Sequence, residues 1–180
     1  MVTLYKIVKY ITFPGALLKG FLEHLFCRLF GIPVENTEYM QSNELCGHVE
    51  HELAGQKGSF AICWLPHLLM LFLGFGTALP GAISLLYLGT ISVLPIILLY
   101  VGVSFLANAC PLEEDVLNMW ENLYGKDSSS KTVSKIFLAI PAAAMYVGAY
   151  LEKWGFSLLS GFLCAWALPY VIQLFTPLGL

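Results

Sequence analysis

Long apolar runs alternate with clusters of charged residues along this chain. No charged residue occurs between Lys57 and Glu113. A helix rises about 1.5 Å per residue, so about 20 apolar residues cross the hydrocarbon core of a bilayer. We therefore predict two membrane-spanning helices in this gap, at residues 59–79 and 82–107. The turn between them is expected at residues 78–81, where Pro and Gly interrupt the pattern.

A second apolar region begins after Lys135 and is interrupted only at residues 151–155. The interruption predicts two further spans, at residues 136–150 and 156–175. We therefore expect four spans, or five if the N-terminal segment also crosses the membrane.

The first 31 residues are apolar enough to enter a bilayer but carry charges near their middle. Lys19 and Glu23 are four positions apart, so they share one helix face and can form an ion pair. Pro14 and Gly15 predict a kink ahead of this pair. We expect an ion pair that faces the interior of a helical bundle. An amphipathic helix lying in the membrane plane is the alternative.

Two polar segments, residues 32–57 and 108–134, separate the apolar runs. Within the second, residues 113–124 have helical spacing, which predicts a helix on the membrane surface. With five spans, both segments lie on the same side of the membrane. The expected apolar side of the surface helix consists of Val116, Leu117, Trp120 and Leu123. The acidic residues of the two segments are Glu35, Glu38, Glu44, Glu50, Glu52, Glu113, Glu114, Asp115, Glu121 and Asp127.

Composition supports a membrane protein. Of 180 residues, 58% are hydrophobic and 12% are charged, whereas soluble domains carry about a quarter charged residues. This composition argues against a water-soluble enzyme, and a net charge of −3 leaves no basic surface for nucleic acid. We predict an all-α polytopic integral membrane protein of four to five transmembrane helices that forms one membrane domain. Its parts are residues 1–31 (kinked first helix), 32–57 (acidic loop), 58–107 (two spans), 108–134 (polar loop with surface helix) and 135–180 (two spans).

Three stretches together resemble the zincin peptidases, membrane metallopeptidases related to the site-2 proteases. Residues 13–34 have the Pro-Gly and apolar run that frame an HExxH motif in this family. Residues 47–52, GHVEHE, are similar to its Gly-Tyr-Val-x-His-Glu element. Residues 104–111, SFLANACP, with the following Asp, Asn and Trp, are similar to its Ser-x-x-x-His-Ala-Phe-Pro-Ser segment. The resemblance covers about two-thirds of the chain, although each motif alone is weak.

The motif positions themselves depart from this family. In HExxH, two histidines on one helix face bind zinc and the glutamate activates the zinc-bound water. In the matching register the ligand and base positions hold Lys19, Gly20 and Glu23, and Asn108 stands where a later histidine is expected. Asp115 remains at a position that could have completed the metal site, but one carboxylate does not hold zinc. The resemblance thus implies a metallopeptidase fold with a degenerate site. From the i,i+4 spacing and the opposite charges of Lys19 and Glu23, we hypothesise that their ion pair takes the place of the metal.

The four histidines are the other candidates for chemistry. His48, His51 and Glu52 are possible zinc ligands, with Cys46 nearby, but GHVEHE has no established zinc spacing. For His24 we favour a structural hydrogen bond. His67 lies in a predicted span, where an ionisable side chain has either a function or an interhelical hydrogen bond.

We expect a non-catalytic scaffold, sensor or complex subunit that lies in a membrane and binds a partner through its polar segments. The expected contacts are membrane lipid and either further copies of the chain or a partner protein, with no nucleic acid and no cofactor. One alternative is an oligomeric pore lined by Asn108 and His67. Another is an active zinc metallopeptidase with relocated ligands drawn from Glu23, His24, His48, His51, Glu52 and Asp115.

Overall fold

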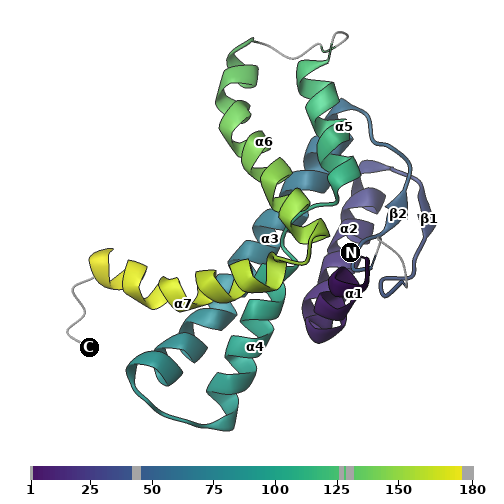
Figure 1. The fold of residues 1–180 in the computed structure, drawn as a ribbon. Helices are drawn as coiled ribbons and strands as arrows, with labels where there is room; N and C mark the ends of the chain where they lie inside the picture. The colour runs from purple at the N-terminus through teal and green to yellow at the C-terminus, as the bar shows by residue number, and fades with distance from the viewer. Residues whose placement is uncertain (1, 42–45, 126–127, 129–131, 176–180) are drawn as a thin grey trace.

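The computed structural model describes residues 2–41, 46–125, 128 and 132–175. The described chain is mostly helical, as predicted, and also contains a two-stranded antiparallel sheet within residues 32–57 (Figure 1). Glu44 and Asp127 lie outside the described residues. The helices are α1 (Val2–Ile11), α2 (Phe13–Phe30), α3 (Gln56–Ala82), the π-helical turn η1 (Ile83–Tyr87), α4 (Val93–Ala107), α5 (Glu113–Tyr124), α6 (Thr132–Lys153) and α7 (Ser157–Phe175). The strands are β1 (Val34–Asn36) and β2 (Glu50–His51).

The predicted kink in the N-terminal segment is confirmed. α1 ends at Ile11 and α2 begins at Phe13, immediately before Pro14. Proline has no amide hydrogen and is therefore favoured in the first turn of a helix. α2 ends at Gly31, whose φ of 68° lies in the left-handed region that glycine adopts without strain.

The predicted turn at residues 78–81 is wrong. α3 continues through Pro80 and passes into η1, and the chain reverses only afterwards, near Gly89. Gly81 instead permits close helix packing, because a Cβ there would lie 2.7 Å from both the Leu99 amide nitrogen and the Pro95 carbonyl oxygen. α3 and α4 consequently form a hairpin whose backbones touch.

The break at residues 151–155 occurs as predicted, between α6 and α7. α7 then packs across α4 (Figure 1). At the crossing, a Cβ on Gly161 would lie 2.9 Å from the Ala107 nitrogen. Glycine at this position therefore sets the separation of the two helices.

α5 has the predicted bounds, but its buried side is only partly the predicted one. Val116 and Leu123 are buried, whereas Leu117 and Trp120 are 48% and 38% exposed. The inward face is completed by Met119 and the carboxylate of Asp115. This face packs against α3 and α6 in a core that includes Cys63, Val116, Met119, Ala142 and Met145.

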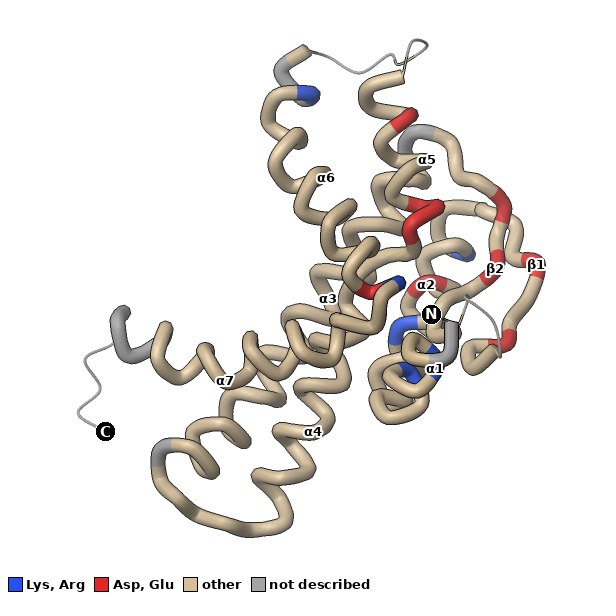
Figure 2. Tube along the Cα trace, viewed as in Figure 1, with Lys and Arg blue, Asp and Glu red and all other residues tan. Residues whose placement is uncertain are grey.

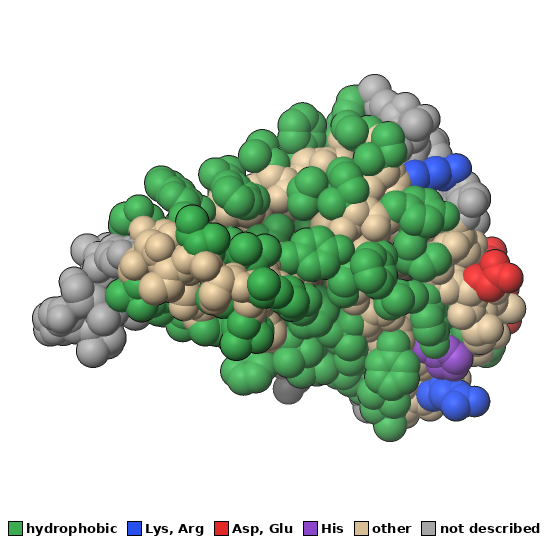
Figure 3. Space-filling view, turned by 90° about the horizontal axis from the view of Figure 1, so that it is seen from below, with side chains coloured by type: hydrophobic (Ala, Val, Ile, Leu, Met, Phe, Trp, Pro, Cys, Tyr) green, Lys and Arg blue, Asp and Glu red, His purple; other side chains and the backbone are tan. Residues whose placement is uncertain are grey.

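Charge and apolar surface separate along the molecule. Charged residues gather on α1, α2, the strands, α5 and the ends of α6, while α4 and α7 carry none (Figure 2). Apolar side chains cover much of the face seen in Figure 3, and charged side chains lie at one end of it. Two helical segments, Gly58–Leu86 and Lys135–Lys153, are long and apolar enough to cross a membrane.

Candidate functional site

Lys19 and Glu23 form the predicted ion pair on the inner side of α2. Their side chains are buried, and Lys19 Nζ lies 3.4 Å from Glu23 Oε1. Gly20, between them in sequence, packs against Tyr39, whose Cδ1 would lie 2.7 Å from a Cβ at this position. The pair therefore faces the interior of the bundle.

The loop before β2 completes the environment of Glu23. His48 Nδ1 lies 3.0 Å from Oε1, and the Val49 amide donates to Oε2 at 3.1 Å. Lys19 also donates to the carbonyl oxygen of Ala109, 3.4 Å away in the segment that follows α4. Both carboxylate oxygens of Glu23 thus have partners, and the pair joins α2 to two other segments.

A second buried ion pair connects α1 to the end of α6. Lys9 of α1 contacts Glu152 Oε1 of α6, and both side chains are buried. Lys9 Nζ also donates to Asn108 Oδ1 at 2.8 Å. No spacing rule predicts this pair from the sequence, because 143 positions separate its members. The only signal was a lysine within an apolar helix and an acid in the interruption between two apolar runs.

Asn108 connects this pair to the start of α2. Its Nδ2 group lies 2.9 Å from Thr12 Oγ1 and 2.8 Å from the Ser104 carbonyl oxygen. Ser104 Oγ donates to the Thr12 carbonyl oxygen and accepts from the Gly15 amide, each at 2.8 Å. Side-chain hydrogen bonds therefore connect the kink between α1 and α2 to the end of α4.

His48 joins the two ion pairs into one cluster. Its Nδ1 faces Glu23 Oε1, and its Nε2 lies 3.5 Å from Glu152 Oε1. Burial lowers the pKa of His48, but the two carboxylates outweigh that effect and hold the pKa above its usual value. We call Lys9, Lys19, Glu23, His48 and Glu152 the buried ion cluster.

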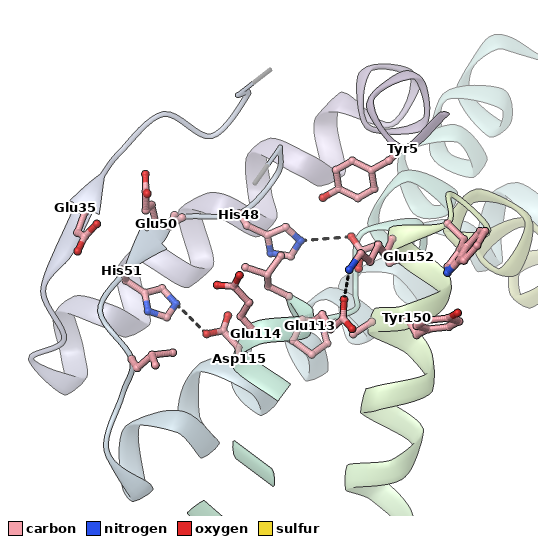
Figure 4. A pocket seen from close by; sticks show the side chains of 17 residues that line it. Tyr5, Glu35, His48, Glu50, His51, Glu113, Glu114, Asp115, Tyr150 and Glu152 are labelled. Atoms are coloured by element: carbon pink, nitrogen blue, oxygen red, sulfur yellow. Dashed lines mark hydrogen bonds and ion pairs between the residues drawn. The ribbon is translucent and has the colours of Figure 1, made fainter. Parts of the chain in front are cut away.

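An open pocket of about 740 Å³ adjoins this cluster, and His48 and Glu152 form part of its wall (Figure 4). The rest of the wall comes from the β1–β2 region, the beginning of α5 and the end of α6. Both polar segments thus meet on one side of the molecule. The pocket's carboxylates are Glu35, Glu50, Glu113, Glu114, Asp115 and Glu152.

Two ion pairs on the pocket wall join β2, α5 and α6. His51 Nε2 lies 3.4 Å from Asp115 Oδ1, and Lys153 Nζ lies 2.7 Å from Glu113 Oε2. Burial lowers the pKa of His51, but the hydrogen bond and charge of Asp115 outweigh it and raise the pKa to about 9. His51 Nδ1 contacts the Glu52 carbonyl oxygen at 2.9 Å. With acceptors at both ring nitrogens, the imidazolium form is favoured.

The candidate zinc ligands do not converge. His48 and His51 face different carboxylates, and Glu52 is exposed. Within residues 2–41, 46–125, 128 and 132–175, no group of three or more His, Cys, Asp or Glu side chains is arranged to hold a metal ion.

The remaining histidines make structural contacts. His24 Nδ1 lies 3.2 Å from the Tyr39 hydroxyl oxygen. His67 Nδ1 lies 2.9 Å from the Ala109 carbonyl oxygen, which also accepts from Lys19. His67 therefore makes the hydrogen bond between segments that is one of the two roles expected for it.

Comparisons with protein-family models, curated proteins and solved structures find no match to this chain.

Proposed function

We propose that this chain is a non-catalytic, multi-pass membrane protein that serves as a scaffold, sensor or complex subunit. The observation that carries the proposal is the buried ion cluster, in which Lys9, Lys19 and His48 lie against the buried carboxylates of Glu23 and Glu152. Its polar end, with the pocket and both polar segments, is the part that would bind a partner.

The donors at the degenerate motif do not fit zinc. Zinc prefers thiolate, imidazole and carboxylate ligands. The motif positions hold the ammonium group of Lys19, which would repel the ion, and Gly20, which has no side chain to act as a base. The side chain of Asn108 is hydrogen-bonded to Lys9 and Thr12. In the register of the resemblance, the ligand and base chemistry of a metallopeptidase is therefore missing.

The placement of charge supports a membrane location with several spans. α4 and α7 carry no charged residue and expose large apolar side chains, among them Ile97 and Leu163, each 50% exposed. Such surface is stable against hydrocarbon and costly against water. If α3 and α6 are two transmembrane spans, α4 and α7 would bring the number of spans to four. The kinked α1–α2 unit is the candidate for a fifth span.

Metal content tests the proposal. The protein is purified in detergent as wild type and as His51→Ala, and bound metals are quantified by mass spectrometry. We expect no stoichiometric zinc in either preparation. Near-stoichiometric zinc in the wild type that disappears in the variant would overturn the proposal and favour a metallopeptidase with relocated ligands.

A further inference from the structure

The pocket at the polar end carries more negative charge than its own cations neutralise. Six carboxylates line it, against one lysine and two histidines. Lys153 pairs with Glu113, and His51 pairs with Asp115. Among the described residues, Glu35, Glu50 and Glu114 make no ion pair. The pocket thus has an uncompensated acidic wall.

An unsatisfied buried atom provides independent evidence for a ligand. Glu152 Oε1 contacts Lys9 and His48, but Oε2 is buried without a hydrogen-bond partner in the described part of the chain. Glu152 is only 3% exposed and lines the pocket (Figure 4). A buried carboxylate oxygen without a donor is costly, so a donor from a ligand in the pocket would relieve a real deficit.

The remaining walls suit an organic cation better than a bare metal ion. Tyr150 and Trp154 line the pocket with ring centroids 5.9 Å apart, and such aromatic faces attract ammonium and guanidinium groups. Leu53, Leu112 and Ala149 add apolar surface on which an alkyl chain can pack. The volume of about 740 Å³ is typical of a pocket for an organic ligand.

We propose that this pocket binds a lysine or arginine side chain of a basic peptide segment in a partner protein. The charged head of that side chain donates toward Glu152, its alkyl stem packs on the apolar wall, and neighbouring basic residues meet Glu50 and Glu114. The inference rests on the proposed function, since it gives the chemistry of the partner that the scaffold would bind.

Fluorescence anisotropy with a labelled lysine-rich peptide and the full-length protein in detergent tests the proposal. We expect saturable binding that is lost when the peptide lysines are acetylated, because acetylation removes their charge. Glu114→Gln and Glu50→Gln should each weaken binding by up to about fivefold. The matched control is Glu121→Gln, which removes an acid from α5 outside the pocket and should leave binding unchanged.

Glu152→Gln tests the base of the pocket, with thermal unfolding recorded in parallel. A folded variant should bind the peptide more weakly than wild type. If this variant does not fold, Glu50→Gln and Glu114→Gln decide the question. Equal binding of the acetylated peptide, or equal losses from the pocket variants and Glu121→Gln, would overturn the proposal.

A second arm distinguishes the source of the amine. The same titration is run in nanodiscs of phosphatidylcholine with and without phosphatidylethanolamine. We expect the peptide to bind equally in both. Loss of peptide binding in the nanodisc that contains phosphatidylethanolamine would assign the pocket to a lipid headgroup and overturn the peptide proposal. Absence of peptide binding together with absence of zinc would overturn this inference and leave the proposed non-catalytic function standing.

Discussion

At the scale of single residues, the buried ion cluster combines one local and one distant ion pair. The local pair, Lys19 and Glu23, follows from i,i+4 spacing on one helix and was therefore predictable from the sequence. Lys9 and Glu152 are brought together only by the tertiary fold, so no spacing rule identifies them. His48 connects the two pairs, which likewise depends on how its loop folds back over α2.

Replacing Lys19 with methionine should destabilise the protein. The substitution leaves the buried carboxylate of Glu23 without its lysine, and breaking a buried ion pair costs on the order of 3 kcal/mol. Unfolding in mixed detergent measures the change. Lys6→Met is the matched control, because Lys6 lies on α1, is only partly buried and makes no ion pair among the described residues. Unchanged stability in Lys19→Met would rule out a structural role for the pair.

The His51–Asp115 pair should make stability depend on pH. The pKa of His51 is raised from 6.5 to about 9 in the folded protein. The pair's contribution is therefore complete below about pH 6.5 and is lost as pH rises through about 9. Thermal unfolding across this range should show a decline in wild type that Asp115→Asn reduces. A parallel decline in both proteins would show that the pair contributes nothing.

At the scale of secondary structure, local patterns predicted most of the helices but not every connection. The apolar spacing identified α5 with its observed bounds, and the charged interruption separated α6 from α7. The prediction of a turn at residues 78–81 was wrong, because Gly81 instead lets α3 and α4 pack closely and Pro80 is tolerated inside α3. Proline and glycine mark turns in soluble chains, but in packed apolar helices they often mark close approach.

Close packing in the α3–α4 hairpin gives a test with a matched control. A Cβ on Gly102 would lie 2.4 Å from the Ala78 nitrogen, whereas a Cβ on Gly76 would meet nothing within 4 Å. We expect Gly102→Ala to destabilise the protein by about 1–3 kcal/mol through overpacking. Gly76→Ala should be neutral or slightly stabilising, because alanine favours helix over glycine. Equal effects on the unfolding midpoint would contradict the hairpin packing.

At the scale of the whole molecule, the fold separates a polar end from an apolar body. α1, α2, the strands and α5 carry most of the charges and surround the pocket and the buried ion cluster, while α4 and α7 carry none (Figures 2 and 3). The clustering of charged residues along the sequence already indicated this division. The sequence did not indicate that a pocket would form where the two polar segments meet the end of α6. That arrangement depends on which helices lie side by side in the fold.

We propose that protein cations, and not a metal ion, stabilise the interior of this protein. The most direct test is the thermal unfolding midpoint of the detergent-purified protein with excess zinc, without added metal, and after incubation with a chelator. A metal that binds the folded state raises its stability in proportion to the logarithm of metal concentration. We predict the same midpoint in all three conditions. A midpoint that falls on chelation and recovers on adding zinc would show that a bound metal ion stabilises the protein instead.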